Sequence, residues 1–229
     1  MIEFCIALAA FLVAHLIPAS PGLRAGLIAH MGRTTYLVAY SMLSLALLGW
    51  LIVAARRAET VWLWDPAPWQ WHIPFIVMPI AAFLLVAGLT QPNPLSISFH
   101  SGKTPGPITA VTRHPVLWAF LLWALAHIPP NGTLVALLLF GTMAAFSLIG
   151  FVLLDAKARK RLGPERWRAL SAGTSVIPFA ALVAGKAPWS ALSRLVLPAL
   201  AAAALYLWFV FQGHALLIGV DPLAGLMTG

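Results

Sequence analysis

Charged residues are scarce in this sequence, and acidic residues are scarcer still. Only 9% of the 229 residues are charged and only six are Asp or Glu, whereas about a quarter of a soluble domain is usually charged. The chain is 61% hydrophobic, with a mean hydropathy of +0.91. This composition excludes a water-soluble globular fold. It predicts an all-α protein, a polytopic helix bundle in a membrane.

Several kinds of chemistry lack the residues they need. The one cysteine, Cys5, cannot form an internal disulfide. No acidic residue falls in the middle of an apolar run, which leaves little material for paired-carboxylate catalysis. No HExxH, CxxC or glycine-rich phosphate loop occurs, and no Ser-His-Asp or Cys-His arrangement is visible in the sequence. The seven histidines therefore become the main candidates for a site.

Six apolar segments are present, and crossing a bilayer takes about 20 residues. They cover residues 3–17, 36–55, 73–90, 115–129, 133–154 and 195–218. We predict a single domain, residues 1–229, with about six transmembrane helices separated by proline-containing connections. The basic stretch 156–170 is predicted to be a helix on the membrane surface, and 174–190 to be interfacial or re-entrant.

The basic residues predict the orientation in the membrane. All Lys and Arg except Arg56 and Arg57 fall in the connections after the first, third and fifth segments, which share one side of the membrane. The positive-inside rule then places both termini outside the cytoplasm. The net charge of +8 accordingly indicates topology and contact with membrane lipids, and not nucleic acid.

Two histidines are predicted to lie deep in the membrane. His15 follows Glu3 by twelve residues and His127 follows Pro115 by twelve, so each lies about 18 Å along its helix from opposite faces. The two depths overlap near the middle of a hydrocarbon layer of about 30 Å. Each imidazole either ligates a metal or forms a hydrogen bond to a neighbouring helix. The sequence leaves both readings open.

The missing residues narrow the choice of metal. A closed zinc site needs further cysteines or carboxylates, whereas a b-type haem needs only one or two axial imidazoles. We therefore hypothesise haem b with His15 and His127 as iron ligands. Its propionates would need cations on the inner side, for which the candidates are Arg24, Arg33, Lys103 and Arg113.

Arg113, His114 and Pro115 are predicted to begin a helix, because proline favours the first helical turn. His114 is thirteen residues from His127, which is about 20 Å along a helix and about 140° around it. These two histidines cannot share one ion. Arg113 and His114 are instead predicted to face anionic lipid or an anionic group of a bound cofactor.

Three motifs stand out in the sequence. They are H-x-I-P-A-S-P-x-L-R (15–24), G-R-x-x-Y-x-x-x-Y-S (32–41) and T-R-H-P-x-L-W-x-x-x-x-W-x-x-A-H (112–127) followed by Asn131-Gly132. Together they resemble the NnrU family. That family is associated with nitrite and nitric oxide respiration and is related to cis-zeta-carotene isomerases, which are membrane proteins that bind haem b. The resemblance implies His15 and His127 as the axial ligands. It also implies nitric oxide or a hydrophobic polyene as the ligand or substrate.

The sequence departs from the isomerases at one position. A cysteine three residues before the second histidine is a proposed alternative ligand there, and Ala124 occupies that position here. The absence of this cysteine counts against a thiolate ligand switch and against the isomerase activity. Haem binding does not depend on the cysteine.

A second resemblance is to isoprenylcysteine and phospholipid methyltransferases. It rests on Arg113-His114-Pro115 and on L-G-P-E-R-W-R-A-L (162–170). The paired glutamates that hold S-adenosylmethionine in those enzymes are absent, and only Asp155 and Glu165 flank the basic run. A methyltransferase, a haem enzyme or sensor, and a non-catalytic assembly factor for a respiratory enzyme all remain open. The sequence identifies no catalytic residue.

Overall fold

The computed structural model describes residues 1–17, 20–100 and 104–224, and their secondary structure is helical apart from one isolated bridge between Trp62 and Thr133. The contacts divide the chain into two compact units. Unit 1 is Met1–Trp64 with Thr133–Leu139, and unit 2 is Asp65–Gly132 with Phe140–Gly229. Each unit is described by itself.

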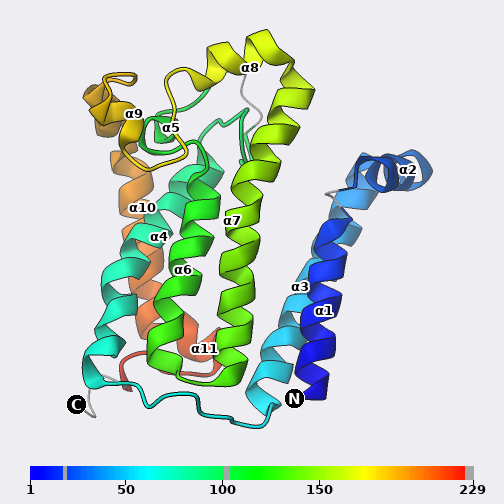
Figure 1. Cartoon of the computed structure of the whole chain (residues 1–229), viewed down its shortest axis with the longest axis vertical. Helices are drawn as coiled ribbons and strands as arrows, with labels where there is room; N and C mark the ends of the chain where they lie inside the picture. The colour runs from blue at the N-terminus through cyan, green and yellow to red at the C-terminus, as the bar shows by residue number, and fades with distance from the viewer. Residues whose placement is uncertain (18–19, 101–103, 225–229) are drawn as a thin grey trace. The chain divides into compact units, whose positions relative to one another are not determined.

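Unit 1 is built on two apolar helices that lie side by side, α1 (Ile2–Leu16) and α3 (Arg33–Arg57) (Figure 1). Phe4 and Ala7 of α1 are fully buried against Leu51 and Ala54 of α3. The connection between them, which the sequence predicted to be a loop, contains a further helix, α2 (Pro21–Met31). This helix begins at a proline and ends at Gly32, whose φ of +81° favours glycine.

Unit 2 is a helix bundle, with the short helices α5, α8 and α9 at one end and the short helix α11 at the other (Figure 1). Helix α4 packs between α6 and α10, and the part of α7 from Phe140 onward packs on α6 through Leu121, Ala124 and Ala144. The long elements are α4 (His72–Thr90), α6 (Pro115–Asn131), α7 (Leu134–Leu162) and α10 (Val196–Trp208). The short ones are η1 (Pro68–Trp71), α5 (Ile108–Val111), α8 (Pro164–Ser171), α9 (Ala180–Val183), η2 (Trp189–Leu195), η3 (Phe209–Gly213) and α11 (His214–Ile218).

A glycine sets the distance between α4 and the start of α6. Ala81, Leu84, Ala87 and Gly88 form the buried face of α4. A Cβ atom placed on Gly88 would lie 2.9 Å from Pro115 Cγ and 2.9 Å from Val116 Cγ2. The two helices are therefore closer than any larger residue would allow, as is common where membrane helices pack.

Four helical stretches in the described residues are long and apolar enough to cross a membrane: 33–57, 68–90, 134–162 and 189–218. With the shorter apolar helix α1, they give the helical membrane bundle that the composition predicts. Each of the six predicted apolar segments is found in a helix or a run of adjoining helical turns.

The ends of two predicted helices differ from expectation. Helix α6 continues through Pro129 and Pro130 to Asn131, where the sequence predicted a turn. The Asn131 amide donates a 2.7 Å hydrogen bond to the carbonyl of His127, and Gly132 then ends the helix with a φ of +50°. Helix α7 continues to Leu162, so the predicted surface helix 156–170 is the end of α7 followed by α8.

Candidate functional site

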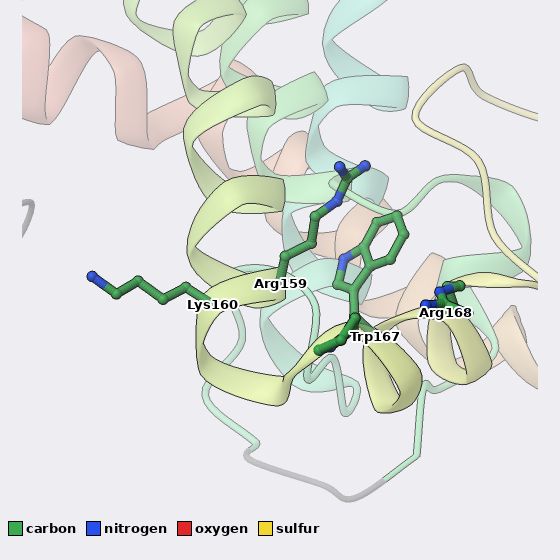
Figure 2. A pocket seen from close by; sticks show the side chains of 5 residues that line it. Arg159, Lys160, Trp167 and Arg168 are labelled. Carbon is green, nitrogen blue, oxygen red and sulfur yellow. The ribbon is translucent and has the colours of Figure 1, made fainter.

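A cationic groove lies where α7 turns into α8 (Figure 2). Its volume is about 490 Å³, and its lining consists of Arg159, Lys160, Pro164, Trp167 and Arg168. Gly163, with a φ of +77°, allows the chain to turn there. A second pocket of about 490 Å³ lies beside α9 and includes Arg113, Thr174, Ser175 and Lys186 in its lining. This end of unit 2 is rich in positive charge.

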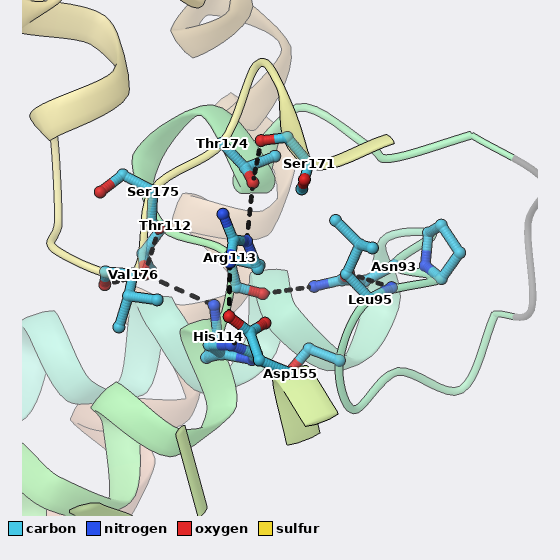
Figure 3. A network of polar contacts seen from close by, with 12 residues as sticks. Asn93, Leu95, Thr112, Arg113, His114, Asp155, Ser171, Thr174, Ser175 and Val176 are labelled. Carbon is cyan, nitrogen blue, oxygen red and sulfur yellow. Dashed lines mark hydrogen bonds and ion pairs between the residues drawn. The ribbon is translucent and has the colours of Figure 1, made fainter. Parts of the chain in front are cut away.

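Between the pocket residues and the bundle lies a buried polar cluster (Figure 3). Thr112, Arg113 and His114 are all buried, and His114 is 0% exposed. They connect α5 to α6, with His114 as the residue just before the helix and Pro115 at its first position, as predicted. The polar side chains at this helix start therefore point into the protein.

The carboxylate of Asp155 binds both basic residues of the cluster (Figure 3). Arg113 Nη1 lies 2.6 Å from Asp155 Oδ2, and His114 Nε2 lies 3.1 Å from Asp155 Oδ1. The expectation that Arg113 and His114 face lipid headgroups is therefore wrong for the His114 ring and for the Nη1 group of Arg113, because both contact Asp155 inside the protein. The reason is that α7 continues past residue 154 and carries Asp155 to them.

Further hydrogen bonds hold Arg113 and its neighbours in place. Arg113 Nε donates to Thr174 Oγ1 (2.9 Å), and the Arg113 amide donates to the carbonyl of Ser175 (2.7 Å). The Asn93 amide donates to the Arg113 carbonyl at 2.9 Å. Trp118 Nε1 donates to the carbonyl of Val176 at 2.8 Å. The cluster thus joins three distant parts of the chain to the start of α6.

The partners of the His114 ring determine which of its nitrogens carries the proton when the ring is neutral. Nδ1 lies 2.8 Å from Ser96 Oγ, and Nε2 lies near the Asp155 carboxylate, which can only accept. A neutral ring donates from Nε2 to Asp155 and accepts the Ser96 hydroxyl proton at Nδ1. Burial lowers the pKa of His114 below 6.5, and the nearby Arg113 lowers it further, although Asp155 opposes both effects.

We expect this histidine to make stability fall in mild acid. Because its pKa is lower in the folded state, the unfolded chain binds more protons as the pH drops below about 6.5. The free energy of unfolding should decline by up to about 1.4 kcal/mol per pH unit until the folded-state pKa is passed. Unfolding measured between pH 7 and 5 should show a weaker decline in His114→Gln. Equal slopes would contradict this assignment.

Hydrogen bonds connect Ser96 to His114 and His114 to Asp155, which are the residue types of a catalytic triad. This arrangement was not visible in the sequence. Here the histidine is fully buried, and the carboxylate is also paired with Arg113. Ser96 lines neither of the two pockets described above. A nucleophile must reach its substrate, so we assign these residues a structural role.

The two histidines predicted as haem ligands lie in different units, His15 on α1 of unit 1 and His127 on α6 of unit 2. Both side chains are half-buried, whereas Arg24 and Arg33 are exposed. Within the described residues no group of three or more His, Cys, Asp or Glu side chains is arranged to hold a metal. Lys103, the remaining predicted propionate partner, lies outside the described residues.

The fold and the cluster define a helical membrane protein with an Arg–His–Asp network at the start of one bundle helix. A comparison with protein families matches NnrU protein over residues 3–222. The chain therefore belongs to the NnrU family. No curated protein and no solved structure matches the chain.

Proposed function

We propose that this NnrU-type protein binds haem b in the bacterial inner membrane, with His15 and His127 as axial ligands. We link this role to nitrite and nitric oxide respiration, with nitric oxide or a hydrophobic polyene as ligand or substrate. The observation that carries the proposal is the hydrogen bonding of the two imidazoles, which is the same in both.

Each imidazole is held by its own helix. His127 Nδ1 lies 2.7 Å from the carbonyl of Trp123, and His15 Nδ1 lies 2.7 Å from the carbonyl of Phe11. A carbonyl only accepts, so both Nδ1 atoms carry the proton and both Nε2 atoms keep a lone pair. Within the described residues neither Nε2 has a hydrogen-bond partner. Metal-ligating histidines typically show this arrangement.

Two aromatic rings lie near each histidine, and an apolar macrocycle could pack against such rings. The centroid of the His127 ring lies 5.1 Å from that of Phe140 and 5.8 Å from that of Trp123. In unit 1, the His15 ring lies 4.1 Å from Phe11 and 6.1 Å from Tyr40.

Unit 1 also offers an unused donor near His15. Tyr36 stacks on Tyr40, with ring centroids 6.1 Å apart, and its side chain is buried. The Tyr36 hydroxyl has no hydrogen-bond partner among the described residues. A buried hydroxyl without a partner is costly, and an oxygen of a bound group would satisfy it.

The cations divide into engaged and available groups. Arg113 already contacts Asp155 and Thr174, whereas Arg24 and Arg33 are exposed and form no ion pair in the described part of the chain. Arg24 and Arg33 are therefore the better propionate partners. Haem held by these residues would supply the chemistry, since ferrous haem freed of one of its two histidines could bind nitric oxide or an alkene.

Methyl transfer is less well supported by the same geometry. Asp155, which flanks the basic run in place of the missing glutamates, is held by Arg113 and His114. It is not available for the amino group of S-adenosylmethionine.

A thiolate ligand switch lacks the residue it would need. Position 124 is an alanine, which is 0% exposed and packed against α7.

The proposal includes the finer topology: six membrane crossings with both termini on the periplasmic side. Helices α1 and α6 would provide the two crossings beyond the four long apolar stretches. Helices this short cross a bilayer when they stand nearly upright. The clustering of Lys and Arg in the opposite connections sets the direction.

The test is an optical spectrum of detergent-purified protein, supplied with haem during expression, in oxidised and reduced forms. The wild type should show the Soret band of b-type haem. His15→Ala and His127→Ala should each shift the band or reduce haem occupancy, because each removes one axial nitrogen. An assembly factor without haem would show no such band.

Two matched variants make the ligand assignment specific. His72 is exposed at the start of α4, so His72→Ala should leave the spectrum unchanged. His214 also bonds through Nδ1 to a backbone carbonyl, at 2.7 Å from that of Val220, so it is a third imidazole held in the same way. A spectrum changed by His214→Ala but not by His15→Ala would show that His15 is not the ligand.

A further inference from the structure

The groove between α7 and α8 has a charge imbalance that its own neighbours do not relieve. Arg159, Lys160 and Arg168 line it, and its lining contains no acidic side chain. In the described part of the chain these three residues form no ion pair with a carboxylate. Glu165, the one acid of α8, is exposed and does not line the groove.

Trp167 lines the groove, and its indole N–H has no acceptor among the residues that the structure describes. Arg159 Cζ lies 4.0 Å from the centroid of the indole ring, and Figure 2 shows the Arg159 side chain beside the ring. Trp167 Nε1 is buried without an acceptor in the described residues. A buried indole N–H usually has one. An anionic oxygen would satisfy it if Arg159 turned from the ring toward the same anion.

The length of α7 places the groove at the level of lipid headgroups. Its 29 residues span about 43 Å at 1.5 Å per residue, compared with about 30 Å of hydrocarbon. Its last two turns carry Lys157, Arg159, Lys160 and Arg161, which belong outside the hydrocarbon. Helix α8 then turns Trp167 inward and leaves Arg166 exposed, as expected for a helix at the membrane surface.

We propose that this groove binds the phosphate of an anionic membrane phospholipid, with Arg159 and Arg168 as its ligands and Trp167 in its lining, whereas the Lys160 side chain points away from Trp167 (Figure 2). The shared chemistry is a phosphate group, and the depth of the groove favours a lipid over a free phosphate compound. The site is separate from the proposed haem ligands and is independent of haem binding.

The test measures lipid retained by the purified full-length protein in nonionic detergent, using native mass spectrometry. Phosphatidylglycerol, phosphatidylcholine and inorganic phosphate are the probes. The wild type should retain phosphatidylglycerol at concentrations where phosphatidylcholine is lost, and inorganic phosphate should not displace it. Arg159→Gln with Arg168→Gln should weaken retention by about tenfold or more, because it removes both guanidinium groups that would donate charge-assisted hydrogen bonds to the phosphate.

The matched control removes two positive charges from the same two helices outside the groove. Lys157 and Arg166 are exposed and do not line it, so Lys157→Gln with Arg166→Gln should change retention by less than about threefold. Arg168→Gln alone leaves the Arg159–Trp167 contact intact and should still weaken retention, which separates binding from loss of α8 packing.

Three results would overturn the proposal. Equal losses in the two double variants would indicate unspecific attraction to charge, and equal retention of phosphatidylcholine would indicate that the headgroup charge is not read. Displacement of the lipid by millimolar inorganic phosphate would assign the groove to a soluble phosphate compound. None of these outcomes depends on a haem spectrum, so this proposal and the proposed function fail independently.

Discussion

Asp155→Ala is expected to destabilise the protein by about 3–5 kcal/mol. The variant would leave the buried Arg113 without its carboxylate partner and the fully buried His114 without the acceptor for its Nε2 proton. Removing one partner of a buried ion pair costs this much because the remaining charge stays desolvated and uncompensated. The free energy of unfolding, measured by titrating mixed micelles with a denaturing detergent, checks the value.

Two further variants separate the charge from the packing. Asp155→Asn keeps the shape and one accepting oxygen, so it should lose less than Asp155→Ala. Adding Arg113→Met to Asp155→Ala removes the unpaired charge and should recover part of the loss, although Thr174 then also loses its donor. If Asp155→Ala alone unfolds like the wild type, the ion pair does not hold the start of α6 in the way described here.

The helices of this protein could largely be predicted from the sequence, because apolar length alone determines them. Each predicted apolar segment lies in helical structure, and Pro115 begins α6 as proline at a first turn should. The ends of the helices were predicted less well. Pro129 and Pro130 stay within α6, and α2 forms in a connection that its prolines had marked as irregular. A proline at the start of a helix, as in α2, loses no hydrogen bond because the first amides have no intrahelical acceptor, whereas Pro129 and Pro130 each remove only one amide donor, in the last turn of α6.

The polar cluster was only half visible in the sequence. Arg113 and His114 were recognised as unusual, but their partner Asp155 lies more than forty residues away on another helix. The presence of an acid at this position is the observation that could have identified Asp155 as the partner of Arg113 and His114. An ionisable residue at the end of a long apolar helix needs a partner in the protein, and Asp155 is the one acid next to residues 133–154. Ser96 carried no comparable signal, because an isolated serine in a loop is common.

The proposed haem ligands show what sequence can and cannot supply. The helix on which each histidine lies was predicted correctly. The four-residue spacing along a helix allows the Nδ1 bonds to Phe11 and Trp123. Whether they form depends on side-chain rotamers, which no sequence pattern encodes. The haem itself stays a prediction until the spectrum is measured.

Gly88→Leu is expected to have the second large effect, a loss of about 3 kcal/mol or more. Even the Cβ atom of an alanine here would lie 2.9 Å from both Pro115 Cγ and Val116 Cγ2. Neither neighbour moves easily, since the proline ring is rigid and a valine in a helix has one preferred rotamer. Helix α4 would have to move away from α6, and overpacking of this kind costs about 1–3 kcal/mol for smaller insertions. The free energy of unfolding again provides the measurement.

Alanine at two glycines gives the matched comparison. Gly141 lies in α7 with nothing near the position of an added Cβ, so Gly141→Ala should be neutral or stabilise by up to about 1 kcal/mol through helix propensity. Gly88→Ala receives the same propensity benefit and should still destabilise. The opposite signs isolate the close approach of the two helices from any general effect of replacing glycine. If both alanine variants stabilise the protein, α4 and the start of α6 can separate at little cost, and Gly88 does not set their distance.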